Sequence, residues 1–247
     1  MKGKRIPKIH IGTSGFYYDH WIGKCYPEGI SKHDLLPFYA ERFKTVEINS
    51  TFYHLPRKSS VEHWLEVTPE DFLFTLKAYR GITHYKKLKD ARSELLAFLH
   101  LVNPMKSRLG VLLFQLPPAL KIDLKLLEDF LSELPSGYRY AFEFRHASWV
   151  EDGVFALLER RGAGFCINDF DGMQSPWAVT APFAYVRMHG PQGRYRGRYD
   201  DTQIAALCDR LSDVAAQGRE VFCYFNNDME GFAWENAQML LARCAAH

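Results

Sequence analysis

Short apolar runs recur along the chain, and polar or charged residues end nearly all of them. Each run has four to eight residues rich in Val, Ile, Leu and Phe, and helix-length amphipathic stretches separate most of them. Buried parallel strands in repeated strand–helix units have this pattern. The predicted strands are residues 8–12, 44–49, 72–78, 109–115, 139–145, 164–169, 183–189 and 220–227.

Helical periodicity fills most of the intervals between these strands. A possible capping box at Ser59-Ser60-Val61-Glu62 opens one short helix. The other predicted helices are residues 34–43, 90–102, 123–134, 149–161, 200–217 and 232–246. Residues 170–182 contain Gly172, Pro176 and Pro182 and have little helical periodicity, so we expect the sixth crossover to be irregular.

The strand count and the chain length predict one fold class. The chain has 247 residues, 47% of them apolar, and a closed eight-stranded barrel typically needs ~250 residues. We therefore predict an α/β protein with a TIM-like (β/α)8 barrel, an irregular sixth unit and a single domain over residues 1–247. In such barrels the loops that follow the strands build the active site.

Composition narrows the possible partners and the compartment. A formal charge of +2 gives no global field that would hold nucleic acid or an anionic membrane. There is no apolar stretch of about 20 residues to cross a bilayer and no secretory leader, so we expect no membrane partner. The five cysteines are scattered without a CxxC pair, and we expect reduced thiols in a cytoplasmic protein. The oligomeric state stays open.

Polar side chains gather where the predicted strands end. Residues two apart on a strand share a face, so Glu47 with Asn49, Glu143 with Arg145, and Arg187 with His189 should each point the same way. The remaining candidates at strand ends are Lys77, Gln115, Asp169, Asn226, Asn227 and Asp228. If the shared faces point inward, carboxylates and cations meet in one barrel mouth.

This mouth predicts acid/base chemistry on a small anionic ligand that bears phosphate or carboxylate. Guanidinium groups bind such anions in a bidentate fork, and carboxylates or a histidine can move protons. The proposed catalytic residues are Glu143, Glu47 and His189. The proposed substrate-binding residues are Arg145, Arg187, Lys77, Asn49, Tyr53, Gln115, Asp169, Asn226 and Asn227.

Other interpretations of the same residues stay open. The rim charges can form a structural ion-pair layer that plugs the barrel. We expect neither a metal nor another cofactor, since one strand-end histidine without HxxxH spacing is a poor ligand set and nearby arginines compete for the carboxylates. Glycoside hydrolysis would rest on Glu47 and Glu143 alone. The turn Gly12-Thr13-Ser14-Gly15 is more consistent with flexibility than with a phosphate site.

The alternative function is nucleic-acid binding or a role in DNA repair. The loop 190–199 after the seventh predicted strand alternates glycine, arginine and tyrosine, with Arg194, Arg196 and Arg198. Such a segment can stack on bases and contact phosphates, although short basic loops are also often only solvated.

Several motifs resemble those of one known family. They are Gly12-Thr13-Ser14-Gly15 with His20-Trp21, the segment 45–53, Ile82-Thr83-His84, the segment 113–118, Phe142-Glu143-Phe144-Arg145 with Ser148-Trp149, the segment 185–190 and the segment 224–228. From about residue 9 to its end, the chain resembles the YecE-like barrels, which carry a domain of unknown function (number seventy-two). The resemblance implies a TIM-like barrel with a polar pocket built from these motifs, and it implies no particular reaction.

Overall fold

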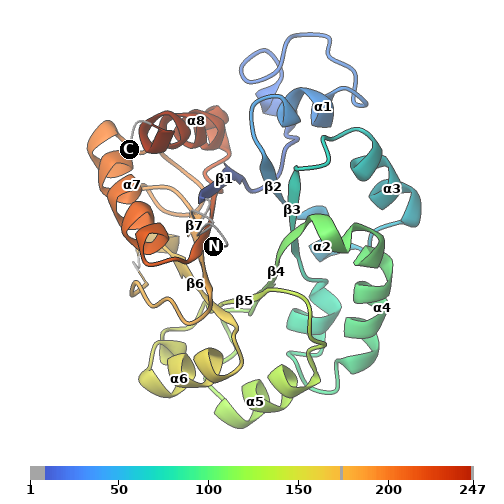
Figure 1. Cartoon of the computed structure of the whole chain (residues 1–247), viewed down its shortest axis with the longest axis vertical. Coiled ribbons are helices and arrows are strands. Elements are labelled where there is room, and N and C mark those ends of the chain that lie inside the picture. Colours follow the sequence, from blue (N-terminus) through green and yellow to red (C-terminus); the bar gives the residue numbers. More distant parts are fainter. Residues whose placement is uncertain (1–8, 173–174, 246–247) are drawn as a thin grey trace, which may run out of the picture.

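The computed structural model describes residues 9–172 and 175–245, and within them eight parallel strands surround a common interior (Figure 1). Each strand lies within two residues of its predicted position at both ends. The strands are β1 (Ile9–Thr13), β2 (Thr45–Ile48), β3 (Leu73–Lys77), β4 (Leu109–Gln115), β5 (Tyr140–Glu143), β6 (Gly164–Asn168), β7 (Phe183–Met188) and β8 (Glu220–Phe225). The predicted TIM-like barrel is confirmed.

The strands pair in chain order, and β1 also pairs with β8. The last join, between β1 and β2, is made through a bridge between Ser14 and Glu47, with Gly15 N donating to Glu47 O at 2.7 Å. Gly12 allows this close approach, because a Cβ at that position would lie 2.3 Å from the carbonyl oxygen of Thr45. The barrel is therefore nearly closed, and the bridge between β1 and β2 contains the candidate site residue Glu47.

Helices cover the outside of the barrel (Figure 1). The α-helices are α1 (Leu35–Ala40), α2 (Ser50–Tyr53), α3 (Lys58–Glu66), α4 (Arg92–Val102), α5 (Leu124–Glu133), α6 (Asp152–Arg160), α7 (Asp201–Ala216) and α8 (Phe232–Ala245). Short helical turns are η1 (Asp19–Trp21), η2 (Gly81–Tyr85), η3 (Asn103–Arg108), η4 (Ala147–Trp149), η5 (Phe170–Gly172) and η6 (Met229–Gly231). Across these described stretches, every helix is too short or too polar to span a bilayer.

Local sequence explains several helix ends. Asp123 accepts a hydrogen bond from Leu126 N at 2.9 Å and starts α5, and Asp200 with Gln203 forms a capping box at α7. The capping box predicted at Ser59 is wrong, since α3 begins one residue earlier and has no side-chain cap. The sixth crossover contains only η5 among its described residues, as its glycine and prolines predicted.

The cysteine expectation is wrong for one pair. Cys208 of α7 and Cys244 of α8 form a disulfide, with Cα atoms 5.9 Å apart. The two helices pack side by side although the two cysteines are 36 residues apart, so sequence spacing could not reveal this proximity. The described thiols that remain free are Cys25, Cys166 and Cys223.

Candidate functional site

The barrel interior is layered from apolar to charged. Near the amino ends of the strands it contains Phe183 and Phe222. One layer higher, the phenol of Tyr224 hydrogen-bonds Thr45 Oγ1 at 2.7 Å and Thr75 Oγ1 at 2.8 Å. Because inward side chains alternate along a strand, the next inward residues are those at the carboxyl ends, where the predicted charges lie.

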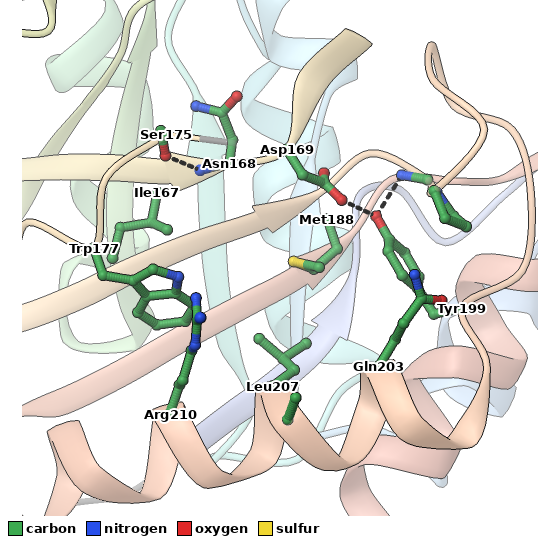
Figure 2. Close-up of a pocket in the computed structure, with 13 residues that line it drawn as sticks. Ile167, Asn168, Asp169, Ser175, Trp177, Met188, Tyr199, Gln203, Leu207 and Arg210 are labelled. Carbon is green, nitrogen blue, oxygen red and sulfur yellow. Dashed lines mark hydrogen bonds between the residues drawn. The ribbon is translucent and has the colours of Figure 1, made fainter. Parts of the chain in front are cut away.

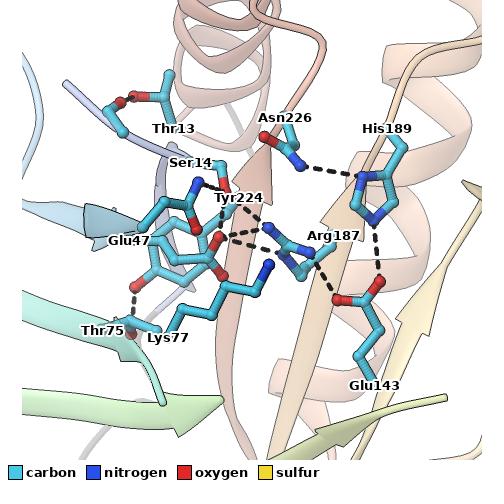
Figure 3. Close-up of polar contacts among 12 residues, drawn as sticks. Thr13, Ser14, Glu47, Thr75, Lys77, Glu143, Arg187, His189, Tyr224 and Asn226 are labelled. Carbon is cyan, nitrogen blue, oxygen red and sulfur yellow. Dashed lines mark hydrogen bonds and ion pairs between the residues drawn. The ribbon is translucent and has the colours of Figure 1, made fainter. Parts of the chain in front are cut away.

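Arg187 is the centre of this charged layer (Figure 3). Its Nη1 lies 2.6 Å from Glu143 Oε2, and its Nη2 and Nε lie 2.7 and 3.1 Å from Glu47 Oε1. All three side chains are buried, and Arg145 pairs with the other oxygen of Glu143. Two carboxylates and two guanidinium groups therefore balance one another, and the inward pairs predicted from the sequence meet in one network.

Glu47 has further partners that sequence reasoning missed. The hydroxyl of Tyr185 donates to Glu47 Oε2, and Ser14 Oγ donates to Glu47 Oε1 while it accepts from Arg187 Nη2 at 2.9 Å. Tyr185 stands two residues before Arg187, so the alternation of the strand was a signal that could have found it. Ser14 had no such signal, because it reaches Glu47 only through the join between β1 and β2.

The ionisation of Glu143 follows from its surroundings. Burial alone would raise the pKa of this carboxyl, but Arg145, Arg187 and a hydrogen bond with His189 together hold the pKa well below its ordinary value. Glu143 therefore stays a carboxylate at neutral pH. Its charge orients the two guanidinium groups.

His189 is neutral and covered. Burial lowers its pKa to about 3, with Arg187 acting in the same direction and Glu143 against it. The amide nitrogen of Asn226 lies 3.1 Å from His189 Nδ1, and His189 Nε2 lies 3.3 Å from both Arg145 Nη2 and Glu143 Oε1. The rings of Phe170 and Tyr195 lie 5.3 and 5.6 Å from the imidazole and shield this side of the mouth.

Two further candidates hold backbone in place. Asp169 accepts from His189 N at 2.6 Å and from the hydroxyl of Tyr199, and burial raises the pKa of its carboxyl. Asn227 points away from the network, because its amide donates to Gly197 O at 2.8 Å and to Asn236 Oδ1 at 3.0 Å. The structure therefore brings Asp169 to the edge of the site and leaves Asn227 outside it.

Lys77 is a cation of the mouth that has no acidic partner at ion-pair distance among the described residues. Its Nζ lies 4.1 Å from the centre of the Phe52 ring, and within the described residues no carboxylate is at ion-pair distance. Figure 3 shows the amine reaching from β3 toward Arg187. Burial, followed by the charge of Arg187, lowers the pKa of Lys77 to about 7 even though Glu143 and Glu47 act against this.

Polar groups around Lys77 have unused hydrogen-bonding capacity. Asn49 donates to Ser14 Oγ at 3.2 Å, but its buried Oδ1 has no partner among the residues described. Gln115 is half-buried at the end of β4, in register with Glu143. Tyr53 lies farther out on α2, with 53% of its surface exposed. At the ends of β2, β3 and β4, the side chains of Asn49, Lys77 and Gln115 are thus only partly buried, unlike Glu47, Glu143 and Arg187.

Comparison with known proteins identifies the family. The family described as "Protein of unknown function DUF72" matches residues 10–247. The chain belongs to the DUF72 family. The UPF0759 protein YunF of Bacillus subtilis is 27% identical, with 94% of this chain and 93% of that protein aligned. The UPF0759 protein YecE of Escherichia coli K12 is 32% identical over 62% of this chain and 54% of its own.

A solved structure agrees with this assignment. The crystal structure of a DUF72 family protein from Thermotoga maritima superposes with a TM-score of 0.86 and 29% sequence identity, over 95% of this chain and 98% of the other. The YecE-like resemblance noted from the motifs is therefore confirmed, together with the barrel.

The arginine-rich loop of this DUF72 barrel is folded back onto the protein. Arg194 pairs with Asp171 at 3.1 Å, and Arg198 pairs with Glu235 at 2.7 Å. Tyr195 packs against His189 and Phe170. Two of the three arginines are thus already neutralised, and the nucleic-acid alternative receives no support from the geometry or from the comparisons.

The irregular sixth crossover leaves a hollow outside the barrel (Figure 2). A cavity of about 340 Å³ lies between β6, β7 and α7, where Ile167 and Met188 line the strand side, Leu207 the α7 side, and Trp177 with Arg210 one end. Asp169 reaches its other end. This cavity is separate from the mouth, and its lining is mixed rather than charged.

The carboxylates of the mouth are not arranged as metal ligands or as a glycosidase pair. In residues 9–172 and 175–245, no three His, Cys, Asp or Glu side chains converge as metal ligands would. Glu47 and Glu143 both bind one guanidinium, whereas a glycosidase needs its two carboxyl groups to face the scissile bond of a sugar.

Proposed function

We propose that this DUF72 barrel is an enzyme that binds a small anionic substrate in its mouth and transfers protons there, with Lys77 as the main proton carrier. The observation that carries the proposal is the unpaired amine of Lys77 beside a neutral network. Arg145 and Arg187 already share the charges of Glu47 and Glu143, so an anion entering the mouth meets Lys77 as the uncompensated cation.

The surrounding residues support distinct roles. Glu143 and Glu47 hold Arg187 in place, and His189 adjoins Glu143 and Arg145 as a neutral ring on the covered side. Asn49 offers its unpartnered carbonyl oxygen to a donor group of the substrate, and Gln115 offers an amide. A lysine whose pKa is about 7 exchanges protons readily near neutral pH, since the best catalytic pKa lies near the working pH.

Anion binding tests the proposal directly. Malonate and phosphate would be titrated at pH 6.5 and pH 9 into the wild type, Lys77→Met and the matched control Lys89→Met, whose lysine is exposed on the surface. Binding heat should be present at pH 6.5 in the wild type and in the control, weaker at pH 9, and lost with Lys77→Met. Equal binding by the Lys77→Met variant would contradict the proposal.

A further inference from the structure

We infer that the amine of Lys77 forms an imine with the carbonyl carbon of its substrate, which makes that substrate an aldehyde or ketone bearing a carboxylate or phosphate. This inference rests on the proposed function and names its substrate class. Lysines act as covalent catalysts when a desolvated site beside another cation keeps the amine neutral and nucleophilic.

The backbone and the neighbours of Lys77 hold the amine in such a site. Thr51 Oγ1 donates to the carbonyl oxygen of Lys77 at 2.7 Å and fixes the end of β3 against α2. The side chain then crosses the face of Phe52 toward Arg187. Because a guanidinium and an aromatic ring adjoin the amine and no described carboxylate lies at ion-pair distance from it, its neutral form with a free lone pair is accessible near pH 7.

A second unpaired cation lies on the same side of the mouth and would hold the anionic group of the substrate. Arg80 is the N-cap residue of η2, three residues after Lys77, and its buried Nε has no hydrogen-bond partner in the described part of the chain. Burial, then the charges of Lys77 and Arg80, lowers the pKa of His84 to about 4, so His84 faces both cations as a neutral ring. His84 also packs edge-on against Phe52, with ring centres 4.8 Å apart.

These four residues, Phe52, Lys77, Arg80 and His84, form what we term the β3 patch. Two cations that lack acidic partners, Lys77 over the ring of Phe52 and Arg80 beside the rings of Tyr53 and Tyr85, suit a ligand with two functions. Arg80 would bind the carboxylate or phosphate, and Lys77 would attack the carbonyl. The motif Ile82-Thr83-His84 lies within η2, so the patch explains a segment that the central network does not use.

The reaction balances without an oxidant or a reductant. The nitrogen lone pair of Lys77 attacks the carbonyl carbon, the C–O double bond opens, and the oxygen takes one of the two protons of the amine to give a carbinolamine. Loss of that hydroxyl as water, with the second proton of the amine, leaves the imine. Protonation of the imine places a positive charge near Glu143 and Glu47, which already favour charge on this nitrogen.

Reductive trapping tests the inference. The intact chain would be treated at pH 7 with glyoxylate, an anionic aldehyde, and cyanoborohydride, which reduces an imine to a stable secondary amine. Peptide mapping would follow labelling at each lysine over time. A pKa of 7 rather than 10.5 gives about 10³-fold more neutral amine at pH 7, and lower intrinsic nucleophilicity reduces this gain. We expect Lys77 to label at least ~10-fold faster than Lys89.

The variants separate this inference from the proposed function. Lys89→Met should leave labelling of Lys77 unchanged, and Arg80→Gln should slow labelling by glyoxylate but not by uncharged acetaldehyde. If Lys77 labels no faster than surface lysines while Lys77→Met still abolishes anion binding, the imine is refuted and the proton-transfer role stands. If Lys77 labels fast but Arg80→Gln changes nothing, the anionic substrate class is refuted.

Discussion

Replacing Lys77 by methionine removes the charge from the barrel mouth and keeps most of the volume of the side chain. A lysine pKa lowered from 10.5 to about 7 corresponds to a penalty of about 5 kcal/mol on folding, at 1.36 kcal/mol per pH unit. The side chain is partly open to water, which screens the charge, so we expect ~2–4 kcal/mol. The methionine variant should therefore be more stable than the wild type near pH 6.5.

The pH dependence is the sharper part of this prediction. Between pH 7 and pH 10.5 the unfolded state holds the lysine proton and the folded state does not, so the stability of the wild type rises with pH across this window. The penalty is complete below pH 7 and absent above pH 10.5. The advantage of Lys77→Met should shrink steadily from pH 6.5 to pH 10.

Urea unfolding at several pH values measures this difference, with Lys89→Met as the control for removal of an exposed lysine. The control should differ from the wild type by less than ~0.5 kcal/mol at every pH. An advantage for Lys77→Met that does not change with pH, or a loss of stability at every pH, would refute the reasoning about the buried amine.

Other predictions follow from the same structure. Arg187→Met leaves the buried carboxylate of Glu47 without a cation, while Glu143 keeps Arg145, and it should lower the free energy of unfolding by about 3–5 kcal/mol in urea titrations, with partial recovery on adding Glu47→Gln; no loss would show that the network adds nothing. Because the pKa of Glu143 is lowered, its contribution should vanish as pH falls through that pKa, and Glu143→Gln should flatten the acid limb of a stability–pH curve. Gly190 has φ +107°, and Gly190→Ala places a Cβ 2.2 Å from the carbonyl oxygen of Arg196. The substitution should lower the free energy of unfolding by about 1–3 kcal/mol in thermal unfolding, and unchanged stability would show that the loop tolerates alanine there. Cys208→Ser should cost about 2–4 kcal/mol without reductant, and dithiothreitol should erase the difference from the wild type.

The layout of the barrel was accessible from the sequence because strand and helix periodicities are local. Each apolar run became a strand, and the glycine and prolines of residues 170–182 correctly predicted the irregular sixth crossover. Alternation along strands also placed Glu143 with Arg145 and Arg187 with His189 on inward faces. These features depend on neighbours a few residues apart, which the sequence displays directly.

The chemistry of the mouth depended on contacts across the barrel. Arg187 reaches Glu47, 140 residues away. The arginines expected to bind an anion and the glutamates expected to carry protons therefore neutralise one another in one network. Asn227, next to Asn226 in sequence, turned outward to hold a loop. Lys77 was expected only to bind an anion, and its lowered pKa arises because tertiary packing buried its amine beside a guanidinium, with no described carboxylate at ion-pair distance. The sequence alone thus determined where the strands lie and which of their residues share a face, and the tertiary structure decided which charges neutralise one another, because only closure of the barrel sets the distances between side chains from different strands.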